Sequence, residues 1–154
     1  MRVCILGSGG MLGHMLVRVL SKTHDVYGTS KQVWSATSGL AKFLSKEKWI
    51  AGVDAKDITT VSDFFREHQF DVVINCIGVV KQRAFRTSEE EMIEVNAHFP
   101  HKLLSICDSS GARLIHISTD CVFSGNKGNY VETDNPDPVA VSYTHLTLPT
   151  KRIV

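Results

Sequence analysis

The sequence predicts an α/β protein built on one doubly wound parallel sheet. Short apolar runs of strand length alternate along the chain with segments of helical periodicity. The run at residues 71–77 is almost continuously apolar, which is typical of a strand buried on both faces of a parallel sheet. Five expected strands alternating with helices make this architecture the favoured one.

The first half of the chain contains three of these strands. One opens the chain at residues 2–6, and apolar side chains then repeat at helical spacing over 11–20, which predicts an amphipathic helix. The residues of its apolar face are Met11, Leu12, Met15, Leu16, Val19 and Leu20. Further strands are expected at 25–28 and 49–53, separated by a loop with a short helix near 40–44.

Helix-capping patterns mark the next helix and its boundaries. Thr60 and Asp63 resemble a capping box, which predicts a helix that begins there and ends near His68. The fourth strand, the apolar run at 71–77, follows directly.

A longer helix and the fifth strand complete the pattern. Ser88, followed three residues later by a glutamate, predicts the start of a helix that Pro100 must kink or divide and that Gly111 ends. Residues 113–118 then form the fifth strand.

Length and composition indicate a single globular domain. The chain has 154 residues, 43% of them hydrophobic and 21% charged, which argues against disorder, collagen and a coiled coil. Lys and Arg number 17 and Asp and Glu 16, so the net charge is only +1. This balance produces no global field for nucleic acid, and we therefore expect an anionic ligand to be held locally and no nucleic-acid partner.

Neither a membrane span nor a secretion signal is expected. The longest apolar runs are far too short to cross a bilayer, and the N-terminus lacks the regions of a signal peptide. No Cys-x-x-Cys pair occurs, so the cysteines are expected to be reduced core residues rather than a redox or metal site. They are Cys4, Cys76, Cys107 and Cys121. The sequence accordingly predicts a cytoplasmic protein with no membrane partner.

The turn between the first strand and the first helix carries a Gly-x-x-Gly-x-x-Gly spacing. Gly7 permits the tight turn, Gly10 lets the backbone approach a pyrophosphate, and Gly13 allows the helix to pack closely on the strand. The N-terminus of the helix presents free N–H groups to phosphates. The alternative is an ordinary glycine-rich turn, but the strand-to-helix context favours a dinucleotide site.

The end of the second strand bears on the choice of dinucleotide. NAD-preferring sites usually carry an acidic residue about 20 residues beyond the glycine loop, whereas this chain has Thr29, Ser30 and Lys31 there. Hydroxyls and a lysine suit a 2′-phosphate, so we expect NADP(H) to be preferred and NAD(H) to come second. The alternative for Lys31 is a solvated loop charge.

Four motifs carry a resemblance to a known enzyme family. They are the glycine loop, DVVINCIG at 71–78, VN at 95–96, and ISTDCVFSG at 117–125 followed by GNYVETD at 128–134. Together they resemble the extended short-chain dehydrogenases/reductases, and among these the dTDP-4-dehydrorhamnose reductase family. The resemblance covers residues 1–140 and implies a Rossmann-like NADP(H)-binding domain.

The resemblance implies roles residue by residue. Thr119 matches the active-site hydroxyl, with Ser118 as its less favoured substitute; the alternative for Thr119 is a strand-end hydroxyl that caps a loop. The cofactor-binding residues that the loop and the resemblance imply are Gly7, Ser8, Gly10, Met11, Leu12, Gly13, Thr29, Ser30, Lys31, Asp54, Ala55, Cys76, Ile77, Gly78 and Asn96. His98 and His101 lack carboxylate or Cys companions, so no metal site is expected.

The implied activity is NADP(H)-dependent reduction of a nucleotide-activated 4-keto sugar. Thr119 would donate a hydrogen bond to the substrate carbonyl, and a Tyr beside a Lys would deliver the proton. One alternative is an epimerase or dehydratase of the same superfamily, which regenerates its cofactor. Another is a non-catalytic NADP(H)-binding or sensor protein. The partner is a nucleotide-sugar substrate, and a homodimer is expected only of a longer protein.

The Tyr-x-x-x-Lys signature of this family is missing. Ser142 and Leu146 occupy the expected positions, and Tyr143 is followed four residues later by Thr147. Residues 141–154 lack a helical period, and their start resembles the translation of a sequencing adapter. We therefore expect a non-native tail on a domain truncated before its last strands and its C-terminal substrate domain. Such a chain would be inactive and would leave a sheet edge uncovered beside the fifth strand.

Overall fold

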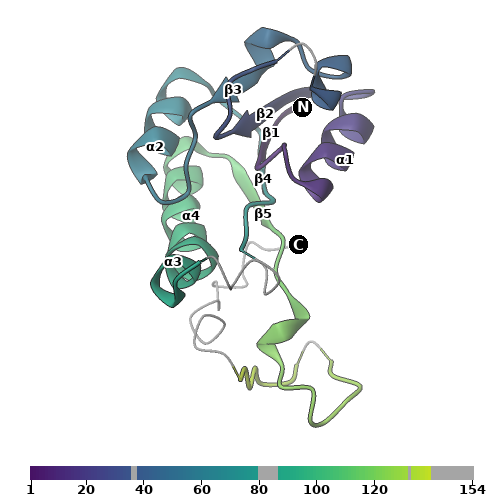
Figure 1. The fold of residues 1–154 in the computed structure, drawn as a ribbon, viewed down its shortest axis with the longest axis vertical. Coiled ribbons are helices and arrows are strands. Elements are labelled where there is room, and N and C mark those ends of the chain that lie inside the picture. Colours follow the sequence, from purple (N-terminus) through teal and green to yellow (C-terminus); the bar gives the residue numbers. More distant parts are fainter. Residues whose placement is uncertain (36–37, 80–86, 132, 140–154) are drawn as a thin grey trace.

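The protein forms a five-stranded parallel sheet in a computed structural model that describes residues 1–35, 38–79, 87–131 and 133–139. The strand order is β3-β2-β1-β4-β5 (Figure 1). The strands are β1 (Arg2–Leu6), β2 (Asp25–Ser30), β3 (Trp49–Ala51), β4 (Val72–Asn75) and β5 (Arg113–His116). The predicted doubly wound sheet is confirmed. Its direction of winding reverses between β1 and β4, where such sheets open a crevice for ligands at their carboxyl edge.

Helices cover the two faces of the sheet. On one face lie α1 (Met11–Leu20) and two short 3-10 turns, η1 (Gly39–Lys42) and η2 (Lys46–Lys48), while α2 (Ile58–Glu67) and α4 (Phe99–Ser110) cover the other (Figure 1). The larger core cluster lies under α2 and α4, and a smaller one lies under α1. Among the described residues β5 pairs only with β4, at the edge that the sequence predicted to be open.

The apolar face predicted for α1 is only partly correct. Of the predicted residues, Leu16 and Leu20 pack against the smaller cluster, but Met11 is 89% exposed and Leu12, Met15 and Val19 are also exposed. The helix contacts the sheet through Gly13 and Val17, because the absence of a side chain at Gly13 lets it approach the turn. Apolar spacing alone therefore indicated a wider buried stripe than the packing uses.

The predicted cap of α2 is wrong by one turn. Asp57 is the capping residue, and its carboxylate accepts a hydrogen bond from the Thr59 backbone N–H (3.1 Å). The Thr60 hydroxyl instead accepts from the Asp54 N–H (3.0 Å) and thereby holds the turn that follows β3. An aspartate is as good a cap as a threonine, so the pattern did not distinguish them.

The long helix before β5 is divided, as predicted, but upstream of the proline. Ser88 accepts from the backbone N–H three residues later (3.2 Å) and caps α3 (Glu89–Ile93). A π-helical turn, η4 (Glu94–His98), follows and joins α3 to α4. Pro100 lies in the first turn of α4, directly after the π-helical turn. Gly111 ends the helix with a φ of +73°, as expected.

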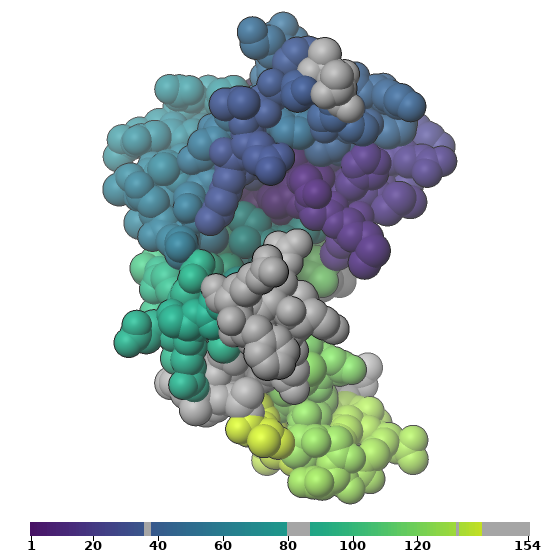
Figure 2. Space-filling model, viewed as in Figure 1, coloured from purple at the N-terminus to yellow at the C-terminus, as the bar shows by residue number. Residues whose placement is uncertain are grey.

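The segment after β5 leaves the sheet and forms the end of the molecule farthest from β3 (Figure 2). It begins with a short turn, η5 (Asp120–Val122), and is then stabilised by side chains: the rings of Phe123 and Tyr130 stack with centroids 4.4 Å apart. The Ser124 hydroxyl donates to the Asp137 carboxylate (2.6 Å). None of the helices in the described ranges is long and apolar enough to cross a membrane.

Candidate cofactor-binding site

The glycine loop after β1 is shaped by close approaches that only glycine allows. Gly7 has a φ of +77°, and a Cβ there would lie 2.9 Å from Ile77 Cγ1. A Cβ at Gly13 would lie 2.4 Å from the Gly7 carbonyl oxygen, so any side chain would force α1 away from the loop. The expected roles of Gly7 in the turn and of Gly13 in close packing agree with this geometry.

Hydrogen bonds to Thr29 of β2 hold the glycine loop in place. The Gly7 N–H donates to Thr29 Oγ1 (3.3 Å), and both the N–H and the hydroxyl of Ser8 donate to the Thr29 carbonyl (3.0 and 2.8 Å). Ser8 is 0% exposed and Thr29 1% exposed. Their side chains therefore support the loop from inside, which corrects the expectation that the Thr29 hydroxyl faces a 2′-phosphate.

The N-terminus of α1 is left open toward the carboxyl edge of the sheet. Gly10 is the capping residue and offers no side-chain hydrogen bond, and the first turn contains no acidic residue. The first backbone N–H groups of a helix have no acceptor within the helix. They lie beside exposed Met11 and Leu12. Unsatisfied N–H groups and the positive end of the helix dipole fit a pyrophosphate.

Opposite the glycine loop, two asparagine amides hold residues 77–79. Asn75 accepts from the Ile77 N–H (3.0 Å). Asn96, from η4, accepts from the Val79 N–H (2.8 Å) and donates to the Val79 carbonyl (2.9 Å). Gly78 lies between these anchors, and a Cβ there would be 3.6 Å from Asn96 Oδ1, an ordinary contact distance. The structure thus brings together the predicted residues Ile77, Gly78 and Asn96, and Asn96 is hydrogen-bonded to the backbone of the residue after Gly78.

Lys31 and Asp54, both predicted to bind the cofactor, form an ion pair with each other. Lys31 Nζ lies 2.9 Å from Asp54 Oδ1, and the Lys56 N–H donates to the same oxygen (2.9 Å). Burial raises the pKa of Asp54, but the hydrogen bonds from Lys31 and Lys56 outweigh it and hold that pKa below its ordinary value. The side chain of Lys31 is 60% exposed, so the pair is open to a competing anion.

Two further predicted residues beside this pair differ in exposure. Ser30 is half-buried and its hydroxyl accepts from the Gln32 N–H (3.0 Å), which leaves its own proton available. Ala55 is buried in the larger core cluster. Its side chain therefore packs the domain and does not line the crevice.

Thr119 follows β5, and the sequence left two roles open for it: an active-site hydroxyl or a hydroxyl that caps a loop. Thr119 Oγ1 accepts from the Cys121 N–H (3.2 Å) and caps η5, which is the loop-capping geometry, and its hydroxyl also donates to Asp120 (3.3 Å). Ser118 is exposed. Burial raises the pKa of Cys76 to about 11, which keeps this thiol protonated and agrees with a packing role.

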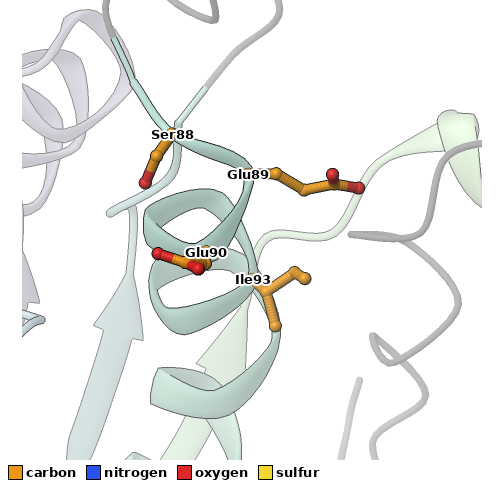
Figure 3. Close-up of a pocket in the computed structure, with 4 residues that line it drawn as sticks. All are labelled: Ser88, Glu89, Glu90 and Ile93. Carbon is orange, nitrogen blue, oxygen red and sulfur yellow. The ribbon is translucent and has the colours of Figure 1, made fainter.

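Other features of the described residues lie apart from this edge. A shallow pocket at the start of α3 is lined by Ser88, Glu89, Glu90 and Ile93, with Glu89 and Ile93 projecting from one side of the helix (Figure 3). Its two carboxylates would repel a phosphate group. No cluster of three metal-ligating side chains occurs among the residues described. The positions expected for the Tyr and Lys, 142–147, lie outside the described residues.

The sequence did not predict a role for His116 at this edge or its pairing with Asn75, which belongs to the motif at 71–78. They end neighbouring strands in register, and their side chains are 3.1 Å apart. The signal available was a polar residue at the end of each otherwise apolar strand. It was insufficient because the partner of each is set by the pairing of β4 with β5.

Comparison with known proteins identifies what the chain is similar to. The model of the family described as "RmlD substrate binding domain" matches residues 1–146. A dTDP-4-dehydrorhamnose reductase of Mycobacterium tuberculosis is 31% identical over 146 residues, which cover 91% of this chain and 41% of that protein. A probable low-salt glycan biosynthesis reductase of Haloferax volcanii is 30% identical over 141 residues, which cover 88% of this chain and 43% of that protein.

A solved structure agrees with these similarities. A hypothetical dTDP-4-dehydrorhamnose reductase from Sulfolobus tokodaii superposes with a TM-score of 0.76 at 28% identity, over 95% of this chain and 49% of its own. The chain therefore spans less than half of the length of these relatives. The family match also reaches residue 146, inside the stretch 141–154 that the sequence suggested was non-native.

Proposed function

Because the chain belongs to the RmlD substrate binding domain family, we propose that it is the cofactor-binding part of an NADP(H)-dependent reductase of a nucleotide-activated 4-keto sugar. The observation that carries this proposal is the carboxyl edge of the sheet. There an uncapped helix N-terminus, a glycine loop with no room for a Cβ at Gly7 and Gly13, and a segment held by two asparagines lie together, at the edge where doubly wound sheets bind their ligands. Relatives named as reductases support the reaction class.

In this proposal the chain's own residues bind and orient the dinucleotide. The N–H groups at the start of α1 hold the pyrophosphate, and Ile77 and Gly78 line the side of the crevice opposite the glycine loop. Lys31 moves from Asp54 to the 2′-phosphate, and the Ser30 hydroxyl donates beside it. A bound nicotinamide supplies the hydride for such a reduction.

Thr119 is the proposed group for the substrate carbonyl. Its hydroxyl proton points to exposed Asp120 at a long 3.3 Å, so a carbonyl oxygen can replace that acceptor while the Cys121 N–H continues to hold Oγ1. The donated hydrogen bond stabilises the charge that develops on the carbonyl oxygen during hydride transfer. The Tyr that the resemblance implies for proton delivery is missing from its expected position, where the chain has Ser142.

Dinucleotide binding by the 154-residue chain tests the proposal. Isothermal titration should give tighter binding of NADP⁺ than of NAD⁺, and Lys31→Met should weaken NADP⁺ binding about tenfold while NAD⁺ binding stays unchanged, since a charge-assisted hydrogen bond is lost. Lys22→Met, at an exposed lysine after α1, is the matched control. A folded chain that binds neither dinucleotide would refute the proposal.

Turnover separates the enzymatic alternatives. We propose that residues 141–154 are non-native and that the 154-residue chain does not oxidise NADPH in the presence of a nucleotide 4-keto sugar. A gene product with a native C-terminus should consume NADPH stoichiometrically, whereas an epimerase would not. In that protein Thr119→Ala should lower kcat strongly with little effect on NADP⁺ affinity, and Thr119→Ser should restore it. Independent sequencing of codons 135–154 decides whether the tail is native, and a confirmed tail would favour the non-catalytic alternative.

A further inference from the structure

One half-buried histidine at the carboxyl edge has no role in the proposed function. His116 ends β5, two residues after Leu114, which packs in the core cluster under α4. Alternate residues of a strand face the same side of a sheet, so the imidazole lies on the α4 side. There its Nδ1 is 3.1 Å from Nδ2 of Asn75, the register partner of His116 on β4.

The proton positions in this pair are determined by a third group. The Ile77 N–H can only donate, so the amide atom that receives it is the Asn75 carbonyl oxygen (3.0 Å). The amide NH₂ of Asn75 therefore faces His116 and donates to Nδ1. A nitrogen that accepts carries no proton, so the imidazole is neutral with its proton on Nε2. Nε2 is buried and has no hydrogen-bond partner among the described residues.

This pair is connected to the glycine loop by direct contact. Asn75 is 0% exposed, so water does not replace either of its hydrogen bonds. The Ile77 backbone that it holds carries the side chain that lies 2.9 Å from the Cβ position of Gly7. The Cys76 N–H donates to the Leu6 carbonyl (3.0 Å) and keeps the two strand ends together. The orientation of the Asn75 amide thus sets the wall opposite the loop.

We propose that His116 is a positioning residue for the cofactor crevice, its neutral imidazole orienting the Asn75 amide so that the Asn75 oxygen holds the Ile77 backbone against the glycine loop. This inference rests on the proposed dinucleotide site. Protonation of His116 places an N–H on Nδ1 opposite the amide NH₂, and two donors cannot bond. If the amide turns over to offer its oxygen to His116, the Ile77 N–H loses its acceptor. Either response loosens residues 77–79.

The groups around the imidazole favour its neutral form at pH 7. Asn75 of β4 is uncharged, and the titratable group from α4 is His101. Burial, and then the proximity of His101, lower the pKa of His116 from its ordinary value. Because the folded-state pKa lies below the unfolded value of about 6.5, the hydrogen bond is fully present above that pH and is lost as the pH falls through the folded-state pKa.

The tautomer of His116 is the direct test and is independent of any cofactor. In a long-range ¹H–¹⁵N spectrum of the ¹⁵N-histidine-labelled chain, assigned by the peak that His116→Gln removes, His116 should be the Nε2–H tautomer at pH 7.5. In Asn75→Ala the tautomer should no longer be fixed. A protonated ring or an Nδ1–H tautomer at pH 7.5 in the unmodified chain would overturn the proposal.

Binding of NADP⁺ at pH 7.5 and pH 5.5 tests the consequence for the crevice. His116→Gln keeps an acceptor that does not titrate, so its affinity should lose less on acidification than that of the unmodified chain. His116→Leu has no acceptor and should bind on the order of fivefold more weakly at pH 7.5. His98→Gln, at an exposed histidine of η4 bonded to Glu94, should behave as the unmodified chain.

The outcomes separate the inference from the proposed function. Equal pH dependence in the unmodified chain and in His116→Gln, or unchanged affinity in a folded His116→Leu, overturns the positioning role while leaving the dinucleotide site intact. Failure of the folded, unmodified chain to bind NADP⁺ at either pH overturns the dinucleotide site, and the positioning role falls with it. The tautomer spectrum then still reports whether the Asn75 to His116 hydrogen bond exists.

Discussion

After β1 the chain turns at positions that must lack side chains, whereas after β4 it is held in place by the side chains of two asparagines. At Gly13 an added Cβ would overlap the Gly7 carbonyl, and the loop is closed by backbone contact. Residues 77–79 instead depend on the amides of Asn75 and Asn96. The two walls of the candidate site therefore have opposite sensitivities. The first, the glycine loop, is disrupted by adding atoms, and the second, residues 77–79, by removing them.

The largest effect is expected from adding one methyl group to the first wall. Gly13→Ala places a Cβ 2.4 Å from a backbone oxygen that cannot rotate away, so we expect a loss of about 3 kcal/mol in unfolding free energy, the upper end of overpacking costs. Denaturant unfolding measures it. Gly9→Ala is the control, since its nearest neighbour would be 3.8 Å away; equal destabilisation of both variants would contradict the close-packing argument.

Removing an amide from the second wall should have the next largest effect. Asn96→Ala leaves the N–H and the carbonyl of Val79 without their partner, and partial access of water limits the loss to about 2 kcal/mol. The same unfolding measurement applies, with Asn126→Ala at an exposed asparagine as control. A stability equal to that of the control would show that the amide does not hold this wall.

Gly28→Ala tests whether overlap with side chains costs less unfolding free energy than overlap with the backbone. A Cβ there would lie 2.7 Å from Leu44 Cδ1 and 2.8 Å from Ser8 Oγ. Because side chains can move where a backbone oxygen cannot, Gly28→Ala should cost about 1.5 kcal/mol, less than Gly13→Ala. Thermal unfolding of the two variants side by side checks the order, and the reverse order would count against this account.

The smallest effect concerns Thr29, one of the two side chains that support the first wall. Thr29→Val removes the acceptor of the Gly7 N–H while keeping the shape of the side chain, for an expected loss of about 1 kcal/mol. Thr29→Ser keeps the hydroxyl and should recover most of it. Thr23→Val, at an exposed threonine, controls for the substitution itself; a neutral Thr29→Val would mean that the 3.3 Å bond contributes nothing.

Local patterns predicted the elements of the fold better than their contacts. Short runs of strand length, alternating with helical patterns, predicted all five strands, and Ser88 was correctly placed as a helix cap, because these signals lie within a few residues of their effect. The cap of α2 was misplaced because Asp57 and Thr60 are both suitable and lie one turn apart. The apolar spacing of α1 did not reveal that Met11 would be exposed.

In the candidate site too, the sequence predicted the local loop better than the contacts between distant residues. The Gly-x-x-Gly-x-x-Gly spacing between a strand and a helix predicted the tight glycine loop, because close backbone approaches require glycine at these spaced positions. By contrast, Thr29 was expected to face a ligand and instead bonds the loop 22 residues before it. Lys31 and Asp54 were each predicted to bind the cofactor, and the structure joins them in one ion pair.

The sequence by itself determined the parallel α/β architecture and the glycine turn, because periodicity and the absence of side chains act over short stretches of chain. Only the tertiary structure decided which polar groups meet. Asn75 finds His116 at a distance of 41 residues along the chain, and Asn96 finds Val79 at 17. Burial forces each such group to take the partner that strand pairing brings within reach, and strand pairing depends on the whole sheet.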